Sequence, residues 1–226
     1  MASARAWNIL AGSAFTLAAC SGPPASLVNP VDPAEIHHVS KYNSCCGHAY
    51  PEQDSPNSAK HYFYPVDSLV NTNDRIHVYA ACAGKVVQEN RDMDSQAIPG
   101  IGEPRGQHFH LYCDGSSTRL RYFHVNHAAA LLGSHVDAGA LLGTADVRCQ
   151  VGTPPNPEQC SDFDVAVSDH SDEETASLFS RLTPEALAAW APRGLTSVSQ
   201  VLRTPAPTCE AYACAHEEPD TFTLSP

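Results

Sequence analysis

The stretch Asp162-Phe163-Asp164-Val165-Ala166-Val167 holds the residues of this chain best placed to do chemistry. Its alternation predicts a β-strand, in which residues i and i+2 point to the same side. Asp162 and Asp164 would then share one face, while apolar side chains fill the other. Two carboxylates on one strand face favour a hard, oxygen-seeking cation such as calcium over zinc.

Histidines add candidate nitrogen ligands and proton donors. His124 ends the stretch Tyr122-Phe123-His124, and His61 stands within Lys60-His61-Tyr62-Phe63-Tyr64-Pro65. We interpret His108-Phe109-His110 as a strand with one histidine-bearing face rather than as a metal site. His48 and Asp54 precede His61 and could lie in the same cleft as His61. A loop hydrogen bond is the simpler role for His48.

The first residues predict export. A single cation, Arg5, precedes an uncharged run of small and apolar residues that ends in Leu17-Ala18-Ala19-Cys20. This is the layout of a secretory signal rather than of a membrane span. Leu-Ala-Ala-Cys is similar to a bacterial lipoprotein box, so we expect residues 1–19 to be removed and Cys20 to be lipidated. The protein would then be anchored in the cell envelope; ordinary secretion with Cys20 incidental is the alternative.

Eight cysteines follow this position, and an even number in an exported chain predicts disulfides. A zinc ribbon does not fit, because the chain has no Cys-x-x-Cys pair. Oxidised cysteines and the lack of a G-x-S-x-G motif also argue against cysteine and serine nucleophiles. Cys45 and Cys46 are expected to have different partners. Local spacing suggests two pairs: Cys149 with Cys160, and Cys209 with Cys214.

Composition predicts one folded domain with tails. Of 226 residues, 42% are hydrophobic and 17% charged, which is enough to bury a core, and 18 prolines with 13 glycines indicate many turns and short strands. The formal net charge is −12. Nucleic acid is therefore not an expected partner, because binding a phosphate backbone needs clustered Lys and Arg.

Turn residues and periodicity divide the chain into segments. Residues 20–40 are rich in proline and predict an extended tether, and residues 41–168 are expected to form the folded body. Within the body, two β segments separated at Gly84 and a hairpin turning at residues 114–117 predict an all-β core. A further strand is expected near residue 141, before the strand of Asp162 and Asp164.

The periodicity changes after residue 168. Thr183, Pro184 and Glu185 supply an N-cap, a proline at the first helical position and a first-turn acid. They predict a helix that ends at Pro192 or Gly194, with a second short helix near residues 196–202. This helical extension covers residues 169–203, and residues 204–226 are expected to form a tail with a cysteine pair.

Four pieces in order carry a family resemblance. They are Val78-x-Ala80-x-x-x-Gly84-x-Val86, Tyr122-Phe123-His124-Val125, Val136-x-x-Gly139-x-x-Leu142-Gly143 and Asp162-Phe163-Asp164-Val165. They resemble V-x-A-x-x-x-G-x-V, Y-x-H-L, V-x-x-G-x-x-I-G and H-L-H-F of the LytM/lysostaphin-type zinc metallopeptidases. The resemblance implies a mainly β fold, a duplicated hybrid motif β-barrel or sandwich, with a short C-terminal helical segment.

The same resemblance implies a set of site residues. In that family, the His and Asp of H-x-x-x-D and the second His of H-x-H hold zinc, and the metal lowers the pKa of a bound water. His124 matches the histidine of Y-x-H-L, Asp162 the catalytic His of H-x-H, and Asp164 the third metal ligand. His61 would be the first ligand, which puts Pro65 where the aspartate belongs. Asp67 could replace that carboxylate through a loop shift.

These replacements bear on activity. A carboxylate can bind zinc at about 2.0–2.2 Å, but Asp164 is shorter than histidine by a ring. Asp162 cannot donate a hydrogen bond while it is ionised, so it is a poor substitute for a histidine that stabilises an oxyanion. Zinc therefore stays possible in the site, while the family's usual peptidase activity is doubtful.

Two hypotheses of function follow. The first is a cell-envelope lipoprotein whose degenerate LytM-type domain binds peptidoglycan, or regulates a cell-wall hydrolase, without cutting. The alternative is an active cell-wall metallo-endopeptidase with altered ligands, drawn from His61, Asp67 or Asp54, His124 and Asp164. A disulfide-stapled extracellular interaction module is a third possibility.

Overall fold

The computed structural model describes residues 22–46, 57–88, 106–148, 162–169, 175–204, 209 and 219–226. Strands account for most of the regular structure in these residues. They are β1 (Ile36–Ser40), β2 (Lys60–Pro65), β3 (His77–Tyr79), β4 (Gly84–Gln88), β5 (Gln107–Cys113), β6 (Thr118–His127), β7 (His135–Val136), β8 (Leu141–Ala145), β9 (Phe163–Asp169), β10 (Thr175–Ala176) and β11 (Thr221–Thr223). The α-helix is α1 (Pro184–Ala188), and short 3-10 turns include η2 (Asp67–Leu69), η6 (Leu178–Ser180), η7 (Ala191–Arg193) and η8 (Val198–Val201).

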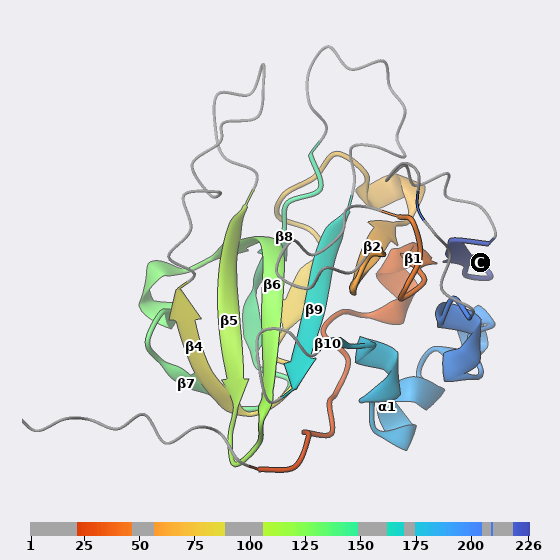
Figure 1. Ribbon diagram of the computed structural model, residues 1–226. Helices are drawn as coiled ribbons and strands as arrows, with labels where there is room; N and C mark the ends of the chain where they lie inside the picture. Colours follow the sequence, from red (N-terminus) through yellow and green to blue (C-terminus); the bar gives the residue numbers. More distant parts are fainter. Residues whose placement is uncertain are drawn as a thin grey trace, which may run out of the picture.

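These strands form one sheet, whose main path is β11-β1-β2-β9-β6-β5-β4-β7. β6 is long enough to serve two partners: residues 118–123 pair with β9, and residues 125–127 pair with β8. β8 in turn pairs with β3, and Figure 1 shows β8 behind β6. The prediction of a mainly β fold with a short C-terminal helical segment is confirmed.

Register gives the central strands a core face and a polar face. His61 lies opposite Val165 and Phe63 opposite Phe163, whereas Tyr62 lies opposite Asp164. Opposed residues share a face of a sheet, and neighbours along a strand point to opposite faces. The core face carries His61, Phe63, Phe109, Leu111, Leu120, Tyr122, Phe163, Val165 and Val167. The polar face carries Lys60, Tyr62, Tyr64, His108, His110, Arg119, Arg121, Phe123 and Asp164.

The helical segment covers the core face of β1, β2 and β9. Thr183 caps α1 by accepting a hydrogen bond from Ala186 N, and Gly194 ends η7 with a positive φ of 86°. Trp190 is fully buried, and its ring lies 6.2 Å from that of Phe63 and 5.1 Å from that of Phe179. The predicted start at Thr183 and Pro184 is confirmed; the α-helix itself ends at Ala188, earlier than predicted, and η7 continues the segment to Gly194.

Residues 27–40 differ from the predicted tether. Leu27, Val31, Ile36 and Val39 are all buried in the core, and β1 lies between β2 and β11. The prolines of this segment suggested an exposed spacer, but its regularly spaced apolar residues gain more from burial than from exposure. From Leu27 onwards, this segment is part of the folded body.

Two disulfides join distant parts of the described chain. Cys45 bonds to Cys209 and Cys82 bonds to Cys113, with Cα–Cα distances of 5.5 and 5.7 Å. The suggested pairing of Cys209 with Cys214 is therefore wrong, because sequence proximity is a poor guide where the tail returns to β1 through β11. Cys46 is also disulfide-bonded. The suggested Cys149–Cys160 pair and Cys214 lie outside the described residues.

The disulfides indicate an extracytoplasmic protein, because such bonds persist in oxidising compartments. Within the described part of the chain, no helix has the length and apolar character needed to cross a membrane. The signal at residues 1–19, the lipidation position Cys20, and the loop residues His48 and Asp54 lie outside the described residues.

Candidate functional site

A buried ion pair lies at the centre of the polar face. The Lys60 ammonium donates to Oδ1 of Asp164 at 2.7 Å, and the two side chains are only 2% and 1% exposed. β2 and β9 bring them together because Lys60 shares a face with Tyr62, which lies opposite Asp164. The strand predicted to carry Asp164 is confirmed as β9, and its carboxylate has a lysine as its partner.

Aromatic rings enclose the ammonium. Lys60 Nζ lies 3.8 Å from the centre of the Phe123 ring and 5.2 Å from that of Tyr62, which is the geometry of cation–π contacts. Burial alone would lower the pKa of Lys60, but the Asp164 carboxylate and the Tyr62 hydroxyl outweigh it and raise the pKa above its usual value. Lys60 is therefore a fixed positive charge.

The other half of the pair stays ionised. Burial alone would raise the pKa of Asp164, but the charge of Lys60, followed by those of His124 and His108, holds this pKa below its usual value. The second carboxylate oxygen, Oδ2, lies 3.8 Å from Nε2 of His124. The Asp164 carboxylate thus lies between two partners, with the Lys60 ammonium at one oxygen and the His124 imidazole near the other.

A β-bulge directs His124 toward Asp164. Between the pairs Gln107–Val125 and Phe109–Tyr122 the register shifts, so that two residues of β6 lie opposite His108. His124 adopts a positive φ of 60° there, which is uncommon for a residue with a side chain. Such bulges turn side chains out of the regular alternation and are frequent beside functional sites.

Backbone contacts hold this bulge. Gly106 lies so close that a Cβ added to it would be 2.4 Å from the His124 carbonyl carbon. Asp146 N donates to His124 O at 2.7 Å, and the buried Asp146 carboxylate accepts from Gly106 N at 3.0 Å. His124 is 26% exposed, so it is the member of the site that solvent or a ligand can reach.

His108 lies beside His124. Their ring centres are 5.2 Å apart in an edge-to-face arrangement, and His108 also contacts the Phe123 ring at 4.8 Å. Alternation along β5 places His108 and His110 on one face, as interpreted from the sequence. Sequence reasoning placed His108 outside the site, whereas the structure brings it next to His124.

His61 does not belong to this site, which corrects its assignment as a metal ligand. It lies on the core face, where its ring contacts Phe179 at 5.0 Å. Nδ1 lies 2.8 Å from the Ser40 carbonyl, so it donates, and Nε2 accepts from the Ser177 hydroxyl at 2.8 Å. Burial lowers the pKa of His61 to about 4 despite the Ser40 hydrogen bond. Both nitrogens of a neutral, buried ring are occupied.

The remaining predicted positions are spread out. Asp67 is exposed in η2, beyond the end of β2. Pro65, the end of β2, is three residue steps from Tyr62, which lies opposite Asp164. This is about 10 Å along a strand, and Asp67 lies beyond it, so Asp67 and Asp164 do not meet. Asp162 is half-buried just before β9, on the side of Asp164 by alternation.

Register places Lys60 and Tyr64, rather than His61 and Pro65, on the face of Asp164. Residues four apart on the face of Asp164 are Lys60 and Tyr64, one residue before the pair read from the sequence. Tyr64 is buried, and its hydroxyl lies 3.7 Å from the sulfur of Cys46. A one-residue shift moves a strand's side chains to the other face. His61 therefore lies on the core face and does not share the site of Asp164.

The residues of this site do not fit zinc. A zinc ion on Oδ1 of Asp164 would lie about 2.0–2.2 Å from that oxygen, where the Lys60 ammonium already donates at 2.7 Å. At an effective dielectric of about 20, unit positive charges 4 Å apart repel by about 4 kcal/mol, and a dication doubles this to about 8 kcal/mol. Among the described residues, no group of three or more His, Cys, Asp or Glu is placed to hold a metal.

No family model and no curated protein matches this chain. Among solved structures, the antimicrobial peptidase lysostaphin from Staphylococcus simulans is similar, with 14% identity and a TM-score of 0.45 over 74% of this chain and 56% of that one. Csd3 of Helicobacter pylori has 15% identity and a TM-score of 0.42 over 71% of this chain and 35% of that one.

A further similar structure is Pseudoalterin, an M23 metalloprotease from the deep sea. Its identity is 14% and its TM-score 0.38, over 71% of this chain and 76% of that one. In another lysostaphin structure the alignment spans half of the matched chain, 50%. The solved structures similar to this chain thus include LytM/M23-type peptidases.

Proposed function

We propose that this protein is a cell-envelope lipoprotein whose LytM-like domain binds peptidoglycan stem peptides without hydrolysing them. The observation that carries the proposal is the buried Lys60–Asp164 ion pair. It puts a permanent cation of the chain itself against the carboxylate that the resemblance assigns to zinc. Zinc, when bound in such a site, would activate a water molecule for attack on a peptide bond, and an ammonium has no open coordination position with which to do so.

The residues left in the site suit recognition. His124 is partly exposed beside Asp164 and can exchange hydrogen bonds with an amide or a carboxylate. The His108 ring lies beside it, 5.2 Å between ring centres, and the Phe123 and Tyr62 rings pack around the neighbouring Lys60 ammonium. A few placed polar groups among aromatic rings are a common lining for a small-ligand site.

Sedimentation with purified peptidoglycan tests this proposal. The Cys20→Ser chain should pellet with peptidoglycan, chelator should not release it, and no soluble fragments should appear. His124→Ala should weaken binding several-fold. His135→Ala is the matched control, because His135 is an exposed histidine that bonds Asp114 at the far end of the sheet.

Three results would point elsewhere. Zinc-dependent release of soluble fragments would favour the active endopeptidase with altered ligands. Loss of sedimentation combined with a changed activity of a cell-wall hydrolase would favour a regulator of that hydrolase. If the chain neither sediments with peptidoglycan nor changes the activity of a cell-wall hydrolase, the third hypothesis remains, a disulfide-bonded extracellular interaction module.

A further inference from the structure

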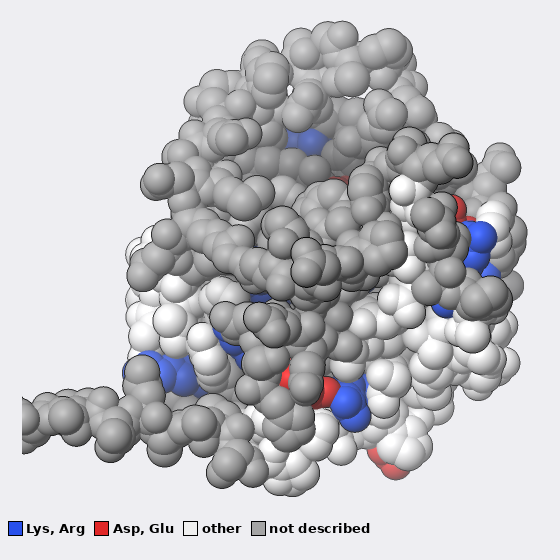
Figure 2. All heavy atoms as spheres, in the orientation of Figure 1, with Lys and Arg blue, Asp and Glu red and all other residues white. Residues whose placement is uncertain are grey.

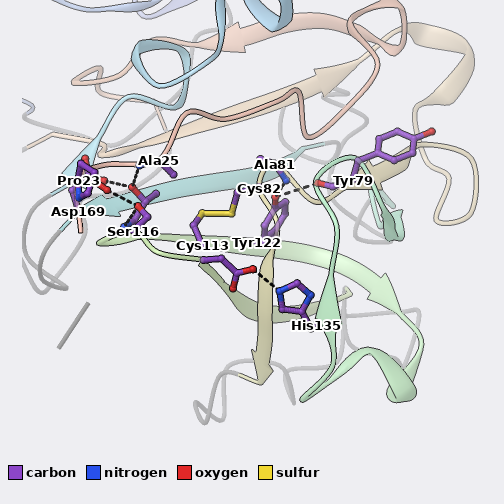
Figure 3. The surroundings of a disulfide bond; sticks show 12 residues. Pro23, Ala25, Tyr79, Ala81, Cys82, Cys113, Ser116, Tyr122, His135 and Asp169 are labelled. Atoms are coloured by element: carbon purple, nitrogen blue, oxygen red, sulfur yellow. Dashed lines mark hydrogen bonds and ion pairs between the residues drawn. A yellow bond between two sulfur atoms is a disulfide. The ribbon is translucent and has the colours of Figure 1, made fainter. Parts of the chain in front are cut away.

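The described chain begins docked against the turn between β5 and β6. A Cβ added to Gly22 would lie 2.2 Å from the Gly115 carbonyl oxygen, so the two backbones are in direct contact. The Ser116 hydroxyl donates to Pro23 O at 2.9 Å. Figure 3 shows Pro23 and Ala25 beside Ser116, with the Cys82–Cys113 disulfide nearby.

Side chains of β6 and β9 fasten the next residues. Ala25 N donates to the Thr118 hydroxyl at 2.8 Å, and this hydroxyl donates to Oδ1 of Asp169 at 2.6 Å. Arg181 bonds the other oxygen of Asp169. Leu27, two residues after Ala25, is fully buried, and its N–H donates to Arg181 O at 2.8 Å. The segment from Gly22 is therefore fixed to the body almost from its first described residue.

This docking point and the Lys60–Asp164 site lie at opposite ends of the same strands. Thr118 starts β6 at the docked end, and His124 lies six residues further along it, which is about 20 Å at the rise of a β-strand. β9 runs the other way, from Asp164 near the site to Asp169 at the docked end. Figure 1 shows the chain entering at the end of the sheet where β5 and β6 are joined.

We propose that the β5–β6 turn faces the lipid surface and that the Lys60–Asp164 site points away from it, toward the cell wall. This inference rests on the lipidation of Cys20 in the proposed function. Cys20 is two residues from Gly22, so at most about 7 Å of chain separates the acylated residue from the docked segment. The domain stands directly on the membrane rather than on a free tether, and its site is held at a fixed height above it.

Depth-dependent quenching in vesicles tests this orientation. A dye is placed through a non-natural amino acid at Ala138 or at Ser68 in the full-length lipoprotein. Ala138 is exposed and lines the same surface hollow as Pro23 and Asp114, whereas Ser68 is exposed in η2 beyond the opposite end of β2. A nitroxide on the lipid headgroups should quench the dye at Ala138 strongly and the dye at Ser68 weakly.

A spacer provides the control. Twenty Gly/Ser residues inserted after Ser21 span roughly 25 Å on average, and they leave the docked segment intact. The spacer should lower quenching at Ala138 to the level seen at Ser68. Equal quenching of the two positions in the native chain, or no effect of the spacer, would overturn the orientation, as would the absence of acyl groups by mass spectrometry. Peptidoglycan binding of the Cys20→Ser chain is scored separately, so peptidoglycan binding and the orientation can each fail alone.

Discussion

The Lys60 ammonium and the Asp164 carboxylate form a 2.7 Å ion pair on the polar face of the sheet, where both are buried. Buried charges of this kind persist only when paired, because removing one partner leaves the other without compensation. The pair therefore couples β2 to β9 and also supplies the site with its own cation.

Lys60→Met should lower the free energy of unfolding by about 3–5 kcal/mol, because it leaves the Asp164 charge buried without its partner. The double variant Lys60→Met/Asp164→Asn should lose less than the sum of the two single variants. Urea denaturation measures all three. Lys85→Met is the control, since Lys85 is exposed on β4 and its loss should change stability by less than about 0.5 kcal/mol. Additive losses would contradict the direct pairing.

Gly106→Ala should displace His124. A Cβ at position 106 would overlap the His124 backbone, and the φ of 58° is itself unfavourable for alanine. We expect a loss of stability above about 2 kcal/mol together with weaker peptidoglycan binding. Gly133→Ala provides the comparison, because Gly133 also has a positive φ, 80°, but open space around it. If both variants behave alike, the close approach to His124 does not position that residue.

The buried His61 predicts a pH dependence of stability. Its pKa falls from 6.5 to about 4 on folding, so between these values the unfolded chain binds a proton that the folded chain does not. Stability should therefore be retained above pH about 6.5 and decline as pH falls toward 4, by on the order of 3 kcal/mol from this residue.

Stability measured by urea denaturation across this pH range tests the prediction. His61→Gln removes the titrating ring, so its stability should depend less steeply on pH over the same interval. An unchanged slope would mean that His61 is not held neutral in the core, and would reopen its assignment as a site residue.

Much of the fold follows from the sequence. Alternating apolar residues predicted β9 and the β5–β6 hairpin, and Thr183-Pro184-Glu185 predicted the start of α1, because these signals are local. The faces of β2 could not be read in this way, since Lys60 through Pro65 are all buried in the structure and show no polar-apolar alternation to fix the register. The sequence therefore favoured His61, while the pairing of β2 with β9 selects Lys60.

The bulge at His124 and the Cys45–Cys209 disulfide also depend on long-range contacts that the local sequence does not indicate. His124 reaches Asp164 through a register shift that depends on the close approach of Gly106, a long-range contact without a local signal. The Cys45–Cys209 bond depends on the return of the chain through β11 to β1. Both are properties of the assembled sheet rather than of any one segment.

Metal analysis of the purified chain tests the central claim most directly, namely that the Lys60 ammonium takes the place of a metal ion at Asp164. After incubation with zinc and removal of the excess, the account predicts no stoichiometric zinc on the native chain. His61→Ala should leave the metal content unchanged. About one zinc per chain, lost on Asp164→Ala, would contradict the account and identify a metal site.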